Sequence, residues 1–217
     1  MDEAIEALKT PPLSDADVIL LQEMDAVGVS RIAAALGMNS VYYPASRPPQ
    51  TTRSFGNGVL SRFAILESHK ILLPGLSRGI GQARASVAAL LEVGERRIVV
   101  YSVHLSSPVG MSGAGRNHQI DAVLADAAKV KEPVVIAGDF NSGGIGERLE
   151  AAGYAWPTRK IGHSIGPFSY DHVFLRGLRL QDASSFGVAK AGPRASDHWP
   201  VWAIVVDERA EAASANP

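Results

Sequence analysis

The sequence predicts an α/β fold of the α+β type, in which two packed mixed β-sheets are flanked by helices. Short apolar runs rich in Val, Ile and Leu recur along the 217 residues, as expected for strands buried on both faces. Several of these runs follow one another with no helical segment between them, and only a few stretches have helical spacing. Strand pairs of this kind argue against a doubly wound parallel sheet, in which strands and helices alternate.

The first half of the chain is expected to contain two helices and six strands. Residues 2–9 have helical spacing and predict a helix that ends before Pro11 and Pro12. Residues 26–36 predict a second helix, which ends at Gly37. Residues 46–58 are rich in Pro, Ser, Thr and Gly and predict a loop. The strands are expected at residues 18–22, 41–43, 58–61, 66–72, 85–92 and 97–103.

The second half begins with a predicted loop at residues 106–115. A helix is expected at residues 117–129, where Ile120, Val123 and Ala127 share one apolar face. A short helix is expected near residues 147–152, and the last residues, 207–217, read as a frayed tail. The remaining strands are expected at residues 134–137, 171–175, 178–183 and 199–206.

Composition limits the class of protein. The length of 217 residues suits one domain with a substantial core, and we expect residues 1–206 to form it. Lys plus Arg number 21 and Asp plus Glu number 22, so the chain has no general positive charge that would attract nucleic acid. The absence of Cys excludes disulfides and thiolate metal sites. No run reaches the ~18 apolar residues of a membrane span, so a soluble protein of undetermined compartment is expected.

Polar side chains stand at the ends of the predicted strands. Carboxylate and amide oxygens recur there beside two imidazoles, and this donor set suits a Mg²⁺ or Mn²⁺ site that performs phosphoryl chemistry. Asp139 and Asn141 lie two residues apart and therefore point to one side of an extended segment, with Phe140 facing the core. The segments are LLQE with Glu23, VYSVHLSS with His104, VVIAGDFNS with Asp139 and Asn141, YDHVFLRG with Asp171, and ASDHWP with Asp197 and His198.

These five segments, in this order, resemble the endonuclease/exonuclease/phosphatase superfamily of DNase I-like metal-dependent phosphoesterases. The resemblance runs from about Asp17 to about Val206 and includes the stretch FGNGVLSRFAI at residues 55–65. It implies a four-layer α/β sandwich with the site in a cleft at one end of the two sheets. It also implies a phosphoester substrate and an ionic cofactor, Mg²⁺ or Mn²⁺.

The resemblance assigns a role to each of the polar residues. Glu23 corresponds to the metal-ligating glutamate, and Asp197 is expected near the metal. Asp139 corresponds to the residue that positions or deprotonates the attacking water, and Asn141 to a donor to a phosphoryl oxygen or a metal ligand. The remaining roles are His104 as a ligand of the scissile phosphate or a proton donor to the leaving oxygen, Asp171 as the partner of His198, and His198 as a base or phosphate ligand.

Each motif also has a structural interpretation. Glu23 could be an ordinary carboxylate at a strand end, GDFN could simply form a turn, and SDH could cap a strand. Arg116, in the pattern R-x-x-Q, either reaches a phosphate or pairs with a surface carboxylate. Asn57, in GN-x-x-L-S-R, is interpreted as a substrate-facing residue, and Arg62 as structural.

Two departures from the family pattern stand out. Some relatives pair the histidine at the position of His104 with a Glu in an REP-like segment, whereas residues 84–86 read RAS here. The resemblance also begins at the first helix, without the preceding strand and its metal-binding Asn. We therefore expect either a truncated start or a degenerate member.

Three functions remain open from the sequence. The first is a metal-dependent phosphodiesterase or phosphomonoesterase that acts on a small or lipid-linked substrate as a monomer. The second is a nuclease, which requires a basic groove with aromatic side chains. The third is a non-catalytic binding protein or inactive fragment on the same fold. Basic residues for the nuclease groove could come from Arg47, Arg53, Arg116, Arg159 and Lys160.

Overall fold

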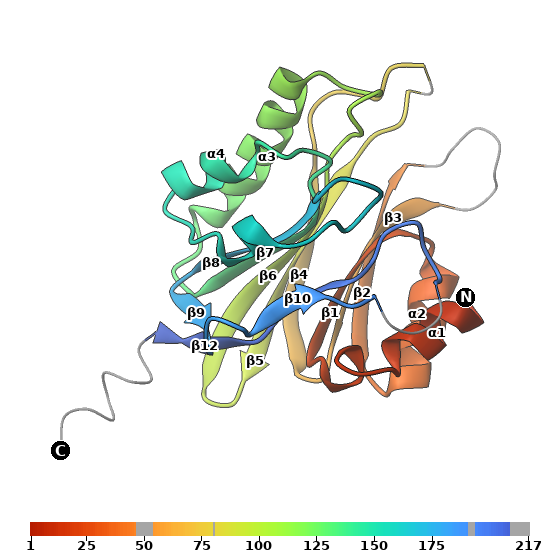
Figure 1. Cartoon of the computed structure of the whole chain (residues 1–217), viewed down its shortest axis with the longest axis vertical. Helices are drawn as coiled ribbons and strands as arrows, with labels where there is room; N and C mark the ends of the chain where they lie inside the picture. The colour runs from red at the N-terminus through yellow and green to blue at the C-terminus, as the bar shows by residue number, and fades with distance from the viewer. Residues whose placement is uncertain (47–53, 80, 191–193, 209–217) are drawn as a thin grey trace.

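The chain folds into four layers, two β-sheets packed face to face with helices on their outer sides (Figure 1). This computed structural model describes residues 1–46, 54–79, 81–190 and 194–208. The helices are α1 (Asp2–Leu8), α2 (Ala26–Leu36), α3 (Gly113–Ala127) and α4 (Gly146–Ala151), with 3-10 turns at Leu13–Asp15 and Pro157–Lys160. The strands are β1 (Val18–Met24), β2 (Asn39–Ser46), β3 (Phe55–Ser61), β4 (Ala64–Leu72), β5 (Ala85–Val93), β6 (Arg96–His104), β7 (Val134–Asp139), β8 (Asp171–Arg176), β9 (Leu178–Leu180), β10 (Phe186–Val188), β11 (Val201–Ala203) and β12 (Val205–Asp207).

The larger sheet has the strand order β4-β5-β6-β7-β8, and the smaller sheet has the order β1-β3-β2. Strands β6 and β7 run parallel, with α3 as the connection between them, whereas the other neighbours in both sheets are antiparallel. Two short antiparallel pairs, β9 with β12 and β10 with β11, complete the described strands. The predicted mixed sheets with few helices are therefore confirmed.

Strand β6 shows why the predicted strands appear as continuous apolar runs. Val100 belongs with Val59 to the cluster between the two sheets, whereas Tyr101 packs with Ile120 under α3. Both faces of β6 are buried, so its sequence does not alternate between apolar and polar residues. A further cluster packs α2 against the smaller sheet.

Local signals in the sequence set the helix ends. The Asp25 carboxylate accepts a hydrogen bond from the Gly28 amide at 2.7 Å and caps α2, which ends at Gly37 with a φ of 65°. Helix α3 begins at Gly113, earlier than the predicted residue 117, because Ser112 caps it through the Gly115 amide at 3.2 Å.

The predicted strand at residues 199–206 is wrong, because the chain divides it in two. β11 pairs with β10, a strand absent from the prediction, and β12 pairs with β9. The division falls at Ile204, whose amide donates to the Ser185 carbonyl at 2.7 Å. The predicted strand at residues 178–183 is correspondingly shorter, because β9 ends at Leu180.

Some predicted features fall outside the described residues. These are Arg47 and Arg53 in the predicted loop, and residues 209–217 of the predicted tail. Asp207, which we assigned to the tail, instead closes β12 opposite Leu178.

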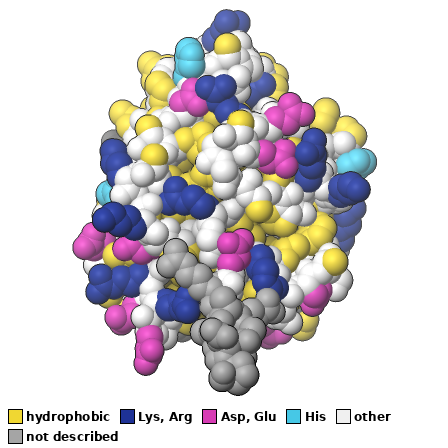
Figure 2. All heavy atoms as spheres, turned by 90° about the vertical axis from the view of Figure 1, so that its left-hand side faces the viewer, with side chains coloured by type: hydrophobic (Ala, Val, Ile, Leu, Met, Phe, Trp, Pro, Cys, Tyr) yellow, Lys and Arg dark blue, Asp and Glu magenta, His cyan; other side chains and the backbone are white. Residues whose placement is uncertain are grey.

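Figure 2 shows the side of the molecule that lies at the left of Figure 1, and on it positive and negative side chains are interspersed. This agrees with a formal net charge of −1 for the whole chain. Within the described ranges, no helix has the length and apolar character needed to cross a bilayer.

Candidate active site

Strand register brings three of the predicted residues into one row. His104 closes β6 and lies opposite Asp139, which closes the parallel strand β7. Asp139 in turn lies opposite Asp171, the first residue of the antiparallel strand β8. A histidine and two carboxylates thus occupy neighbouring positions on three adjacent strands. His104 and Asp139 lie at the C-terminal ends of their strands, as predicted, whereas Asp171 lies at the N-terminal end of β8.

The end of β7 is shaped by two residues with positive φ. Gly138 has a φ of 138°, and a side chain there would overlap the carbonyl oxygen of Val103 on β6. Asn141 has a φ of 49°, and both its amide and its Nδ2 donate to the Asp139 carboxylate at 2.8 Å. Phe140 is fully buried in the core, as predicted, but the positive φ of Asn141 shows that the segment is not extended there, so the predicted alternation of side chains does not hold.

Asp139 is a buried carboxylate with a raised pKa. Its side chain is 9% exposed, and burial together with the charge of Asp171 raises its pKa to about 7. The hydrogen bonds from Asn141 and the charge of His198 oppose this rise only in part. A cation bound beside Asp139 would favour the ionised form.

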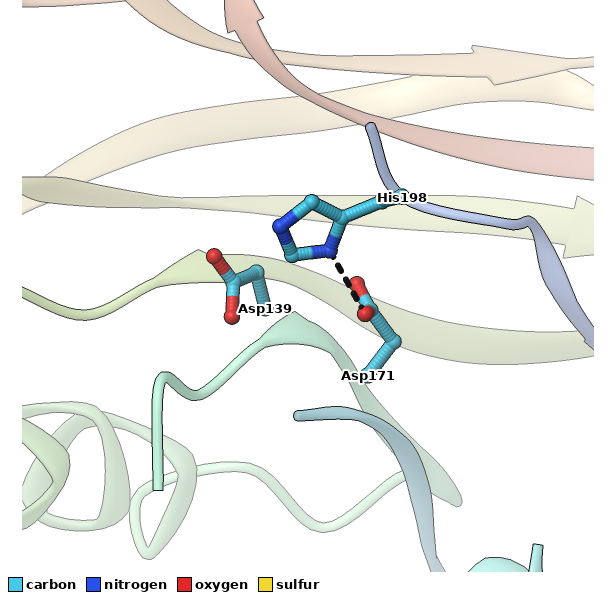
Figure 3. A group of neighbouring side chains, drawn as sticks. All are labelled: Asp139, Asp171 and His198. Atoms are coloured by element: carbon cyan, nitrogen blue, oxygen red, sulfur yellow. Dashed lines mark hydrogen bonds and ion pairs between the residues drawn. The ribbon is translucent and has the colours of Figure 1, made fainter. Parts of the chain in front are cut away.

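His198 forms the predicted pair with Asp171. Nδ1 of His198 lies 2.7 Å from Oδ2 of Asp171, and Figure 3 shows the other ring nitrogen facing the Asp139 side chain. Burial of the ring lowers its pKa, but the hydrogen bond and charge of Asp171, with the charges of Asp139 and Asp197, outweigh burial and raise it to about 9. The Ser164 hydroxyl accepts from the Asp171 amide at 3.2 Å and so helps to hold Asp171.

His104 is buried and lies between two carboxylates. Its Nε2 is 3.5 Å from Oδ2 of Asp139 and 3.7 Å from Oε1 of Glu23. Burial, followed by the positive charges of Arg84 and His198, lowers its pKa well below the usual range, so the ring is neutral at pH 7. Its Nδ1 is buried and has no partner among the described residues, in agreement with the absence of the family's partner Glu.

Two groups of side chains could receive a divalent cation. One ligand atom from each of Asp139, Asp171 and His198 lies within 4.8 Å of the others. A cation held by all three would have to displace a proton from His198, whose pKa is raised to about 9. The Glu23 and Asp139 carboxylates, which converge on His104 without a hydrogen bond to it, supply hard oxygen atoms and fit Mg²⁺ or Mn²⁺ better.

The remaining predicted residues have other contacts. Nδ2 of Asn57 donates to the carbonyl oxygens of Ala85 and Ser102 at 3.0 Å, so this amide joins the two sheets. Nη1 of Arg116 donates to the Met111 carbonyl at 2.6 Å. These contacts are structural, and substrate binding by either residue stays a prediction.

Asp197 is exposed, and its carboxylate accepts a hydrogen bond from the neighbouring Ser196 hydroxyl at 3.4 Å. It adds negative charge next to His198, as the pKa of His198 shows. The ligand cluster of the described residues does not include Asp197, so its role at a metal stays a prediction.

Arg84 and Phe55 also lie at the site, although neither was predicted as a site residue. The Arg84 guanidinium lies over the Phe55 ring at 4.8 Å, and the Phe55 ring lies 5.7 Å from the His104 ring. The available signal was Arg84 itself, the first residue of the RAS segment.

Comparisons with known proteins agree with this architecture. The model of the endonuclease/exonuclease/phosphatase family matches residues 2–198, and the chain therefore belongs to that family, whose members are hydrolases that act on phosphoesters. A comparison with curated proteins gave no match.

Solved structures share the DNase I-like fold at low sequence identity. A family protein from Leptotrichia buccalis C-1013-b has a TM-score of 0.74 at 16% identity, over 94% of this chain and 93% of that one. Sphingomyelinase C from Streptomyces griseocarneus has a TM-score of 0.70 at 19% identity, over 92% of this chain and 90% of that one. D. rerio TDP2 complexed with a single-strand DNA product has a TM-score of 0.68 at 18% identity, over 95% of this chain and 93% of that one. At these identities the comparisons establish the fold and not the substrate.

Proposed function

We propose that this chain hydrolyses a phosphoester with the aid of Mg²⁺ or Mn²⁺ held by Glu23 and Asp139. The observation that carries the proposal is the row of His104, Asp139 and Asp171 on adjacent strands, with His198 paired to Asp171. When bound, the cation would draw charge from a phosphoryl oxygen and support the departing oxygen. Asp139, His198 and His104 would position the water and stabilise the charge on the phosphoryl group.

Asp139 is suited to position the attacking water and to accept its proton. Burial raises the pKa of Asp139 to about 7 in the metal-free protein, and a bound cation would keep the carboxylate ionised and able to accept a hydrogen bond from the water. The two hydrogen bonds from Asn141 fix the orientation of the carboxylate. Water held by Asp139 would therefore be aligned before it attacks.

His198 is suited to stabilise negative charge on the phosphoryl group. With a pKa of about 9 it is protonated at neutral pH and cannot serve there as the base. Its Nδ1 is used by Asp171, which leaves Nε2 to donate to a phosphoryl oxygen. His104, which is neutral, can donate one hydrogen bond to the phosphate or to the leaving oxygen.

The test is hydrolysis of a panel of substrates in Mg²⁺ and in EDTA. The panel contains bis(4-nitrophenyl) phosphate, sphingomyelin, phosphoinositides and plasmid DNA. Turnover of at least one substrate in Mg²⁺, lost in EDTA and restored by Mn²⁺, is the expected result. Full activity in EDTA would remove the metal from the proposal, and no turnover of any substrate would favour the binding-only alternative.

A nuclease is the second candidate, favoured by one pair of aromatic rings. The rings of Phe168 and Tyr170, which precede Asp171 directly in the chain, stack at 5.0 Å with an interplanar angle of 9°. Phe168 is 50% exposed, so a nucleobase could stack on it. In that case Phe168→Ala would lower the rate on DNA and leave the rate on bis(4-nitrophenyl) phosphate unchanged.

A further inference from the structure

Arg84 is a cation buried in the candidate site, and no carboxylate of the described residues forms an ion pair with it. The residue is 7% exposed, and its Nε and Nη1 are buried and make no hydrogen bond with the described residues. Burial of Nε and Nη1 without acceptors is costly, since these donors have lost their hydrogen bonds to water.

The position of Arg84 follows from strand register. Ser86 pairs with Val103 in the antiparallel β5 and β6, so Arg84 lies beside the end of β6 that carries His104. The charges of Glu23 and Asp139 act on the guanidinium, and its own charge acts on His104. Arg84 therefore faces the same space as these three side chains.

The Phe55 ring holds the guanidinium in this position. Arg84 lies over the ring at 4.8 Å, and the other neighbour of the ring is His104 at 5.7 Å. A guanidinium over an aromatic ring is attracted to the face of the ring and can still bind through N–H groups that point away from the ring.

We propose that Arg84 binds non-bridging oxygens of the substrate phosphate, with its N–H fork oriented by Phe55. This inference rests on the proposed phosphoester hydrolysis and adds a residue that contacts the substrate. A planar fork matches two oxygens of a tetrahedral phosphate, which Lys in its place could not do. Contact with the phosphate would also supply the partner that Nε and Nη1 lack.

Binding of inorganic phosphate to the metal-free protein tests the inference without any turnover. Calorimetric titration would compare the wild type with Arg84→Met, Arg84→Lys and the control Arg97→Met, an exposed arginine at the opposite end of β6. Arg84→Met should weaken phosphate binding roughly 10- to 100-fold, because a hydrogen bond to a charged group is lost. Arg84→Lys should recover part of the affinity, and Arg97→Met should bind phosphate as the wild type does.

Thermal unfolding separates this role from a structural one. The cost of burying the Arg84 charge outweighs the attraction of Glu23 and Asp139, so the melting temperature of Arg84→Met without phosphate should equal or exceed that of the wild type. A structural arginine would instead lower the melting temperature when it is removed. Phosphate should raise the melting temperature of the wild type more than that of either Arg84 variant.

Unchanged phosphate affinity in both Arg84→Met and Arg84→Lys would overturn the inference, even if the protein hydrolyses phosphoesters. Loss of phosphate affinity in a protein that hydrolyses no tested substrate would instead retain Arg84 as a phosphate ligand and contradict the proposed function. If Arg84→Met does not fold, Arg84→Lys alone decides, since it retains the charge and changes only the fork.

Discussion

Nδ1 of His198 lies 2.7 Å from Oδ2 of Asp171, although 27 residues separate them in the sequence. The pair joins the segment before β11 to the start of β8. The hydrogen bond and charge of Asp171 overcome the opposing effect of burial and raise the pKa of His198 to about 9. The pair therefore couples the charge of the site to the stability of the fold.

Stability should depend on pH through this pair. The unfolded pKa of His is about 6.5, so the contribution of the pair is fully present below that pH and is lost as the pH rises through about 9. Asp171→Asn should lower the pKa of His198 and remove this contribution. Denaturant unfolding at pH 6 and pH 10 checks this, and an equal effect of Asp171→Asn at both values would contradict it.

Mg²⁺ affinity should rise with pH up to about 7. Asp139 must lose its proton to bind a cation, and burial with the charge of Asp171 raises its pKa to about 7. Below that value the affinity should rise about tenfold per pH unit and then level off. Without metal, the same raised pKa makes stability fall as the pH rises from about 4 to 7.

Calorimetric Mg²⁺ titrations between pH 5 and pH 8 measure this linkage. Asp139→Asn, which keeps the shape of the side chain, should bind Mg²⁺ weakly and without this dependence. Retention of wild-type affinity by Asp139→Asn would mean that the cation is held elsewhere, for example by Asp171 and His198 alone.

Gly138→Ala should be strongly destabilising. The added carbon would overlap the backbone oxygen of Val103, the register partner of Gly138, and the φ of 138° disfavours any side chain. Neither strand can move without disturbing the row of His104 and Asp139. A loss of more than about 2 kcal/mol in the free energy of unfolding is expected. The control Gly162→Ala, where no atom lies within 4 Å of the added carbon, should have little effect.

The strands and the residues at their ends were predictable because both depend on local pattern. Apolar runs identified most strands, and the polar residues after them identified Glu23, His104 and Asp139 as neighbours. The pairing of Asp171 with His198 was predictable only through the family resemblance, because no local pattern relates the two segments.

Other features of the site and the fold depend on long-range contacts that no local sequence pattern predicts. The motif around Asn57 predicted a site residue, yet its amide joins the two sheets through Ala85 and Ser102. Arg84 is a charged residue just before a strand, a type of position that is usually exposed. Strand register and the Phe55 ring instead bury it in the site. The strand predicted at residues 199–206 is divided because β11 pairs with β10 and β12 pairs with β9. These pairings depend on tertiary packing.

The central claim is that Asp139 and His198 act together in one hydrolytic step, and a double-mutant cycle tests it most directly. Asp139→Ala and His198→Ala should each lower kcat by roughly 10²- to 10⁴-fold in Mg²⁺, and His118→Ala, an exposed histidine on α3, should not. The double variant should be only slightly slower than the slower single variant, because the two groups serve the same transition state. Near-normal turnover in either single variant, or losses that multiply in the double variant, would contradict the claim.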